Sequence, residues 1–331
     1  MIGLFKELWR PRKSILQKYD DAWAFKIRGA YVTVSTDMLV ERTDVPPGMT
    51  YELAARKAVV MSSSDIASKG HAPTYHLASV GVRSNTTSRK IREIVAGIRQ
   101  GIAECGGELI GGDTNEAPEL TLSMTTLGIR ETRPIPRILG KEGDIVATTG
   151  GFGGPPSGLL ILLGRATRPR RGLRGLIDAA LRPKAHVKAG VSLAGAAVLS
   201  GSTDSSDGLS ASLHNMIINC DRGAVLQQIP YVRGLEEFAA DNGLDPSNLA
   251  MNGGEEYNLV LSVKRSEWRK ALRVADSEGF ELHRLGKVVR TRGLWMLDRQ
   301  GNKRAIPSGG WSHFERRARK GTGWAPARLI Y

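Results

Sequence analysis

Apolar and polar residues in the first 130 positions repeat with two different periods. Strand-like alternation, or a short apolar run between turn residues, predicts strands at residues 31–34, 74–82 and 120–129. Helical spacing of apolar residues predicts helices at 50–62 and from Ser88 to the Gly106-Gly107 pair. This half of the chain therefore mixes strands and helices.

The second half repeats the mixture after a segment rich in Arg, Pro and Gly, residues 130–143. Strands are predicted at 145–149 and 258–263, and an amphipathic helix begins at Leu209. Two short αβ units then extend to about residue 297. With the boundary placed in the Arg-, Pro- and Gly-rich segment, the predicted domains are residues 1–140 and 141–331.

A loop with four glycines, Gly150 to Gly154, precedes a predicted helix. Such a loop can cradle a phosphate at the N-terminus of the helix. No Gly-Lys-Ser or Gly-Lys-Thr follows, so this is not a Walker A loop, and the glycines can equally serve close packing. The sequence leaves both alternatives open.

Length and composition indicate a globular protein. A chain of 331 residues is long enough for about two domains, each with its own core. Its 41% hydrophobic and 24% charged residues are ordinary for a soluble protein. Cys105 and Cys220 lack the spacing of a metal site or a redox pair, so neither zinc nor a disulfide is expected.

No segment has the pattern of a membrane span or a secretion signal. The longest aliphatic run, residues 159–163, is far too short to cross a bilayer. Residues 1–9 lack the pattern of a signal peptide. We therefore expect a cytoplasmic protein with no membrane partner.

The chain is strongly basic, with a net charge of +14. Much of this charge lies in two Arg-rich segments, residues 165–174 and 315–328. Runs of this kind are more often solvated loops and tails than binding surfaces, and no zinc-finger or RNA-recognition signature is present. Nucleic acid is therefore not the expected partner.

Carboxylates recur at predicted strand ends and glycine-rich turns. The residues are Asp21, Asp37, Asp65, Asp113, Asp204 and Asp207. Any one of them is compatible with a helix cap or a turn, and the corner at Leu109 to Thr114 is weak evidence alone. Asp65 stands in a small, apolar stretch, where a carboxylate is costly without a cation. Repetition across both halves predicts one shared cluster that binds Mg²⁺.

The residues favour metal-assisted phosphoryl transfer. A nucleotide bound between two domains needs several nearby Asp residues to hold its metal ions. No Ser-His-Asp, Cys-His or paired general-acid arrangement can be placed, and the six histidines are scattered. We therefore expect direct transfer with neither a general base nor a covalent enzyme intermediate.

An ordered series of motifs resembles the thiamine-monophosphate kinase family over about residues 20–314. The motifs are STDMLV at 35–40, SSSDIASKG at 62–70, LIGGDT at 109–114, TGGFGGPPSGL at 149–159, LRP at 181–183, TDSSDGL at 203–209, NGGEEYNL at 252–259 and WSHF at 311–314. That family shares a superfamily with aminoimidazole ribonucleotide synthetase, selenophosphate synthetase and a hydrogenase maturation protein.

The resemblance implies a fold and an activity. The fold would be α+β in two domains, the first forming half of an intersubunit β-barrel in a homodimer and the second an αβ sandwich. ATP and several Mg²⁺ ions would lie between them, and thiamine monophosphate would be phosphorylated to thiamine diphosphate.

The resemblance also implies site residues, position by position. The metal ligands would be Asp21, Ser35, Thr36, Asp37, Asp65, Asp113, Asp204 and Asp207. The ATP contacts would be Gly112, Asp113, Arg137 and Ser206. Substrate contacts would come from Asp44, Glu255 and Trp311.

This chain departs from the family pattern at three positions. Tyr19 replaces a usual Gly, Asp44 replaces a His that touches substrate in bacterial members, and Glu256 replaces a common Asp. Two other functions stay open: a different ATP-dependent synthetase of the superfamily, and a non-catalytic basic protein that binds nucleotides or RNA. The chain lacks the reactive N-terminal Cys of selenophosphate synthetase and the C-terminal Cys tail of the maturation protein.

Overall fold

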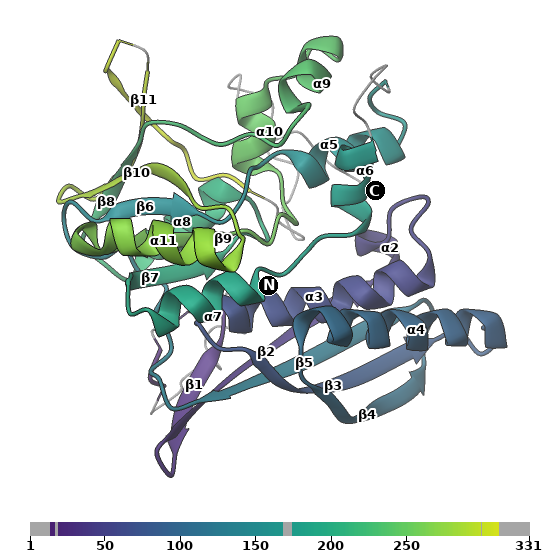
Figure 1. Cartoon of the computed structure of the whole chain (residues 1–331). Coiled ribbons are helices and arrows are strands. Elements are labelled where there is room, and N and C mark those ends of the chain that lie inside the picture. The colour runs from purple at the N-terminus through teal and green to yellow at the C-terminus, as the bar shows by residue number, and fades with distance from the viewer. Residues whose placement is uncertain (1–13, 17–18, 168–173, 299, 311–331) are drawn as a thin grey trace.

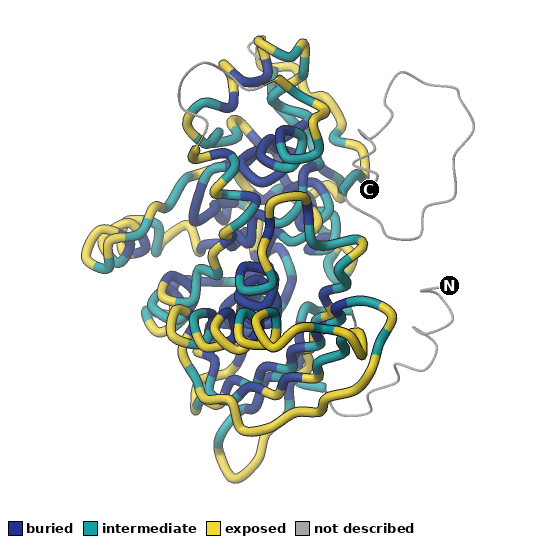
Figure 2. Tube along the Cα trace, turned by 90° about the vertical axis from the view of Figure 1, so that its right-hand side faces the viewer, coloured by how far each residue is buried: buried dark blue, intermediate teal, exposed yellow. Residues whose placement is uncertain are grey.

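The computed structural model describes residues 14–16, 19–167, 174–298 and 300–310. It contains two β-sheets, each covered by helices, with the long helix α3 (Tyr51–Ser68) between the two halves (Figure 1). Buried positions fill the inside of both halves, and exposed positions follow the periphery (Figure 2). The fold is therefore a mixed α and β arrangement around two sheets.

The first sheet has the strand order β1-β2-β5-β3-β4. Its strands are β1 Trp23–Ile27, β2 Ala30–Val40, β3 Pro73–Val82, β4 Glu108–Glu116 and β5 Thr121–Arg130. Strands β3 and β4 are parallel and are connected by helix α4 (Ser88–Cys105), whereas the other neighbours are antiparallel. The short helix α2 (Glu41–Asp44) follows β2. Helices α3 and α4 pack together, and α3 covers one face of the sheet (Figure 1).

Strand β4 corrects one sequence interpretation. The segment from Leu109 to Thr114 was expected to form a corner at a strand end, but it lies inside the nine-residue strand β4. A Cβ atom at Gly112 would lie only 1.8 Å from the carbonyl oxygen of Ala78 in β3. The glycine is therefore explained by close approach of two strands. Likewise, β2 continues through Ser35-Thr36-Asp37 instead of stopping there.

Helix α3 is longer than its sequence pattern predicts. It was expected to end near Ser62, but it continues to Ser68 and includes Asp65. Serines are poor helix formers, so packing on several sides maintains this last part of the helix. Ser62 hydrogen-bonds Thr126 of the first sheet at 2.7 Å, while Ser64 donates to Asp204 of the second half, also at 2.7 Å.

The second sheet has the order β12-β11-β8-β10-β6-β9-β7. Its strands are β6 Ile145–Thr148, β7 Leu199–Asp204, β8 Gly223–Leu226, β9 Leu259–Val263, β10 His283–Val289, β11 Gly293–Leu297 and β12 Lys303–Ala305. Its helices are α5 Gly154–Leu162, α6 Arg174–Leu181, α7 Val187–Gly195, α8 Leu209–Ile218, α9 Leu235–Asp241, α10 Pro246–Asn252 and α11 Trp268–Glu278, with a 3-10 turn, η1, at Arg265–Glu267.

Both faces of the second sheet are covered. Helices α7 and α11 share one apolar cluster with Ile145 and Leu261. Helices α5, α6, α8, α9 and α10 share another with Val146 and Val260, which point to the opposite face. The expectation of two αβ units after β9 was wrong, because one helix, α11, is followed by two successive strands.

The described helices include none that is both long and apolar enough to cross a lipid bilayer. Cys105 is buried, Cys220 is partly buried, and both are free thiols.

Gly190 of α7 makes the contact between α7 and α3. A Cβ atom at this position would lie 2.1 Å from the carbonyl oxygen of Ala67, which belongs to α3 backbone and cannot move aside easily. We expect Gly190→Ala to lower the free energy of unfolding by about 1–3 kcal/mol, the range for overpacking. Denaturant unfolding would measure this change.

Gly195→Ala on the same helix is the matched control. There a Cβ atom would meet only the flexible end of Arg130, at 3.3 Å. Its stability should stay level or rise slightly, because alanine favours helix over glycine. Equal stability of the two variants would contradict the close α3–α7 contact.

Candidate active site

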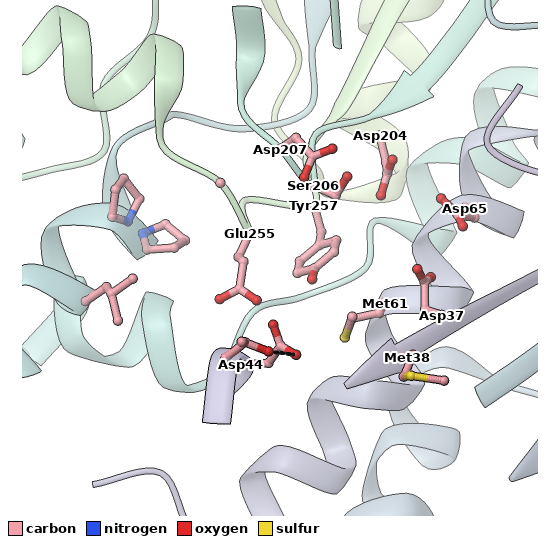
Figure 3. A pocket seen from close by; sticks show the side chains of 15 residues that line it. Asp37, Met38, Asp44, Met61, Asp65, Asp204, Ser206, Asp207, Glu255 and Tyr257 are labelled. Atoms are coloured by element: carbon pink, nitrogen blue, oxygen red, sulfur yellow. Dashed lines mark hydrogen bonds between the residues drawn. The ribbon is translucent and has the colours of Figure 1, made fainter. Parts of the chain in front are cut away.

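A cavity of about 300 Å³ opens between the two halves (Figure 3). It is lined by Asp37, Met38, Thr43, Asp44, Met61, Asp65, Pro155, Pro156, Leu159, Asp204, Ser206, Asp207, Gly254, Glu255 and Tyr257. Six of these residues carry carboxylates, and none of the described lining residues is a Lys, Arg or His. An anionic ligand would therefore need cations that this lining does not supply.

Five of the predicted aspartates converge at one end of this cavity. Single carboxylate oxygens of Asp21, Asp65 and Asp204 lie within 4.8 Å of one another. Asp37 and Asp207 line the cavity beside them (Figure 3). We call these five residues the carboxylate cluster. They come from β2, α3, the end of β7 and two loops, so both halves are needed to assemble it.

Hydrogen bonds from hydroxyl groups orient the cluster. Ser35, another predicted ligand, donates to the carboxylate of Asp65 and, at 3.3 Å, to the backbone oxygen of Asp21. Thr203 donates to Asp21 at 3.0 Å. These hydroxyls fix where the carboxylate oxygens point.

Burial leaves the cluster with charge that the protein does not fully compensate. Desolvation and repulsion by neighbouring carboxylates raise the pKa of Asp204 to about 8 and the pKa of Asp65 well above its ordinary value. Desolvation, with repulsion by Asp207 and Asp21, raises the pKa of Asp37 to about 6. A compact set of hard oxygen donors with excess negative charge fits Mg²⁺, which prefers such ligands. The role of these residues as ligands stays a prediction.

Asp21 differs from the rest because it faces cations. Lys69, which is fully buried, lies 2.8 Å from Asp21 and also pairs with Asp20. Arg137 lies 2.7 Å from Asp21 on the other side. Desolvation raises the pKa of Asp21, but Lys69 and Arg137 outweigh it, so the pKa falls below its ordinary value. Arg137, predicted as an ATP contact, thus pairs with a cluster residue.

The opposite end of the cavity holds two predicted substrate residues. Lys57 of α3 forms an ion pair with Glu255 and donates to the backbone oxygen of Asp44 at 2.9 Å. The carboxylate of Asp44 accepts from the Val40 amide at 2.7 Å and from Thr43 at 3.0 Å. Asp44, which stands where the resemblance places a histidine, is thus hydrogen-bonded within its own turn.

Sequence reasoning missed Lys57, Lys69 and Asp20. The two lysines are fully buried, and a buried lysine requires a paired carboxylate. The available signals were the adjacent Asp20-Asp21 pair and a lysine, Lys57, among apolar residues of a predicted helix. Lys57, Met61 and Asp65 follow one another at four-residue intervals in α3, so they lie along one side of it.

The loop before β9 sends alternate side chains in opposite directions. Glu255 and Tyr257 point into the cavity (Figure 3) and have positive φ angles of 67° and 52°. Their amides donate to the backbone oxygens of Ser206 at 2.6 Å and Ser205 at 2.9 Å, respectively. Burial among apolar and acidic neighbours raises the pKa of the Tyr257 phenol well above its ordinary value.

Glu256 decides between the two interpretations of the glycine-rich loop. Its buried carboxylate accepts from the amide of Gly153, at the start of α5, with Gly154 also contributing. The protein's own carboxyl group therefore occupies the amides that a phosphate would need. In this structure the glycines of the loop therefore serve close packing, the second of the two alternatives.

Glu256 also predicts a pH dependence of stability. Desolvation raises its pKa from 4.5 to about 8 despite the two amides. Between these values the folded state holds a proton that the unfolded state releases, so stability falls as the pH rises from about 5 to about 8. Glu256→Gln cannot titrate and should gain about 2–4 kcal/mol relative to wild type across this range.

Denaturant unfolding at several pH values would measure the difference. Glu237→Gln, an exposed position on α9, is the control and should follow the wild-type profile. Parallel profiles for wild type and Glu256→Gln would exclude a titrating Glu256.

Three predicted site residues lie elsewhere on the first sheet. In the strand register, Thr36 pairs with Thr125, and Asp113 pairs with Ser79, which places both side chains on the face turned away from α3. Asp113 and its neighbour Gly112 lie on the exposed edge strand β4, three strand spacings or about 14 Å from β2. Within one chain, Asp113 therefore does not reach the carboxylate cluster. Trp311 lies outside the described residues.

Comparisons with known proteins identify similar chains. Residues 19–130 match the family model of AIR synthase related protein, N-terminal domain. The thiamine-monophosphate kinase of Nitrosopumilus maritimus is 34% identical over 295 residues, which cover 89% of this chain and 93% of that relative. The thiamine-monophosphate kinase of Pyrococcus horikoshii is 32% identical over 298 residues, with 89% and 90% covered.

A solved structure supports the same fold. AaThiL complexed with AMPPCP and TMP has a TM-score of 0.82 at 22% identity, covering 95% of this chain and 96% of that chain.

Proposed function

Because this chain belongs to the thiamine-monophosphate kinase family, we propose that it transfers the terminal phosphoryl group of ATP to thiamine monophosphate, giving thiamine diphosphate and ADP. The observation that carries the proposal is the cavity between the two halves, lined by six carboxylates. Two substrates whose phosphates meet at such a lining bind there only together with cations. The AMPPCP and TMP bound by AaThiL are an ATP analogue and an acceptor of this kind.

The carboxylate cluster is the proposed metal site. Asp21, Asp37, Asp65, Asp204 and Asp207 would hold Mg²⁺, with Ser35 orienting Asp65. Bound there, Mg²⁺ supplies positive charge that offsets the repulsion between the phosphates. The protein's own contribution is to hold several carboxylates at fixed positions despite their repulsion.

Direct transfer suits the acceptor and the lining. A phosphate monoester has a second pKa of about 6, so its oxygen is already ionised at neutral pH. That oxygen forms the new P–O bond while the bond from the γ-phosphorus to the leaving ADP oxygen breaks. No proton has to be removed first. The described lining residues include no His, Lys or Cys to act as a base or a covalent nucleophile.

The two ends of the cavity would bind different substrates. We assign the triphosphate of ATP to the end with Ser206 and the cluster, and thiamine monophosphate to the end with Asp44 and Glu255. Apolar side chains of Met61, Pro156 and Leu159 lie among these polar groups and suit an aromatic ring. Arg137 would act on ATP through its ion pair with Asp21.

We also propose that the protein is a homodimer joined through the first sheet. The face of this sheet opposite α3 exposes Trp23, Met38, Leu77 and Ile129, and β4 is exposed along its whole length. Exposed apolar side chains on one face of a sheet, beside an exposed edge strand, suit a second copy of the chain. Asp113 and Thr36 lie on this same side, and Gly112 is next to Asp113 in β4, so all three would serve a site that includes the partner subunit. The cytoplasmic location stays a prediction.

The test is incubation with ATP, Mg²⁺ and thiamine monophosphate, followed by separation of thiamine phosphates. Thiamine diphosphate should appear in step with ADP, and unphosphorylated thiamine should not replace the acceptor. Consumption of ATP only with a different acceptor would favour another synthetase of the superfamily.

A further inference from the structure

Tyr257 stands at the centre of the cavity, between the carboxylate cluster and Glu255 (Figure 3). The side chain is only 3% exposed and packs against Val60 and Cys105. Its φ of 52° is uncommon for a residue with a side chain and persists only where the surroundings fix it. Here the amide of Tyr257 donates to the backbone oxygen of Ser205 at 2.9 Å. The phenol is therefore held in one direction, into the cavity.

The hydroxyl of Tyr257 has no hydrogen-bond partner among the described residues. The carboxylates of Glu255, Asp37, Asp204 and Asp44 line the same cavity, and their negative charges contribute to the raised pKa of the phenol. The ring is nearly buried, but the hydroxyl is not among the enclosed polar atoms that lack a partner, and it reaches the cavity, where a bound ligand can supply the acceptor. Most polar groups of this lining accept hydrogen bonds, whereas the phenol donates one.

The position of the hydroxyl matches the place where the two substrates would meet. The metal end lies on one side of it, and the acceptor end, with Asp44 and Glu255, lies on the other (Figure 3). During transfer, negative charge spreads over the oxygens of the moving phosphoryl group at this junction. A neutral donor fixed there stabilises that charge without adding to the repulsion from the carboxylates.

We propose that the Tyr257 hydroxyl donates a hydrogen bond to an oxygen of the phosphoryl group as it passes from ATP to the acceptor phosphate, which makes Tyr257 a catalytic residue. The inference rests on the proposed function. The new P–O bond forms to the acceptor oxygen as the bond to the ADP oxygen breaks, and the phenol keeps its proton throughout.

Tyr257→Phe tests this role because it removes only the hydroxyl and keeps the ring. We expect kcat to fall about tenfold to a hundredfold, the effect of one hydrogen bond to a charged group, with KM for both substrates within about threefold of wild type. Thermal stability and calorimetric binding of a non-hydrolysable ATP analogue should stay at wild-type values. Tyr231→Phe, outside the cavity lining, is the matched control and should keep wild-type kcat.

Three results would overturn the inference. A wild-type kcat in Tyr257→Phe would leave the hydroxyl without a role in transfer. A raised KM at constant kcat would make it a ground-state contact, and a loss of stability or analogue binding would make it structural. If the wild-type protein itself makes no thiamine diphosphate, the proposed function fails, and the Tyr257 role falls with it.

Discussion

Replacing Asp65 by asparagine is expected to lower kcat by about a thousandfold or more. Asp65 lies at the centre of the carboxylate cluster, within 4.8 Å of the carboxylates of Asp21 and Asp204. Asparagine keeps the size of the side chain but removes a charge that a bound cation needs. Steady-state assays at saturating ATP and thiamine monophosphate would measure the loss, and excess Mg²⁺ should restore little of it.

The same substitution should make the metal-free protein more stable. Burial, together with repulsion by Asp37, Asp204 and Asp21, raises the pKa of Asp65, so these carboxylates oppose folding when no cation is bound. Asp65→Asn should therefore unfold at a higher temperature than wild type in chelator, and added Mg²⁺ should shift its unfolding temperature less. A variant that is both active and less stable would contradict the proposed metal site.

Asp144→Asn is the matched control for Asp65→Asn. Asp144 is also buried, but it accepts hydrogen bonds from Ser200 at 2.8 Å and from the Lys141 amide at 2.9 Å, and it is not among the residues that line the cavity. Removing its charge should destabilise the fold and leave kcat near the wild-type value. The two substitutions should thus change stability in opposite directions, and only Asp65→Asn should lower kcat.

Asp113→Asn is expected to lower kcat by about a hundredfold, and mixing it with Asp65→Asn should restore activity. Asp113 points away from the cluster of its own chain, so its proposed role requires the partner subunit. In a mixed dimer, one site would combine a native cluster with a native Asp113, and the other would carry both changes. Complete exchange of equal amounts should give about a quarter of wild-type activity.

Subunit exchange would be verified by labelling the two variants and isolating mixed dimers. Inactivity of isolated mixed dimers would rule out a shared site, because each chain would then need its own Asp113 and its own Asp65. A monomer at assay concentration would contradict the proposed dimer itself.

The carboxylate cluster was predictable from sequence because its chemistry is visible in isolated residues. A carboxylate among small and apolar residues, as at Asp65, needs a cation wherever it folds. Pairs such as Asp204 and Asp207 exceed what caps and turns require. Convergence of five aspartates in the structure follows from these local demands.

Lysines and strand boundaries were harder to predict. Lys57 pairs with Glu255, almost 200 residues away, and local sequence does not reveal such a partner. The Gly111-Gly112 pair resembles a turn because glycine permits turns, yet here it allows β3 and β4 to approach closely. The end of α3 could not be predicted from its serines, which have low helix propensity. Contacts of Ser62 with Thr126 and of Ser64 with Asp204 outweigh that propensity in the folded protein.

Helix α3 fixes the distance between the two ends of the cavity. Lys57, at the acceptor end, and Asp65, at the metal end, are eight residues apart, which corresponds to about 12 Å of helix rise. The spacing of donor and acceptor is thus set by covalent geometry within one rigid rod, and thermal movement between the two halves changes it little. A single residue inserted between Lys57 and Asp65 would rotate Asp65 by about 100° about the helix axis and misalign the two ends.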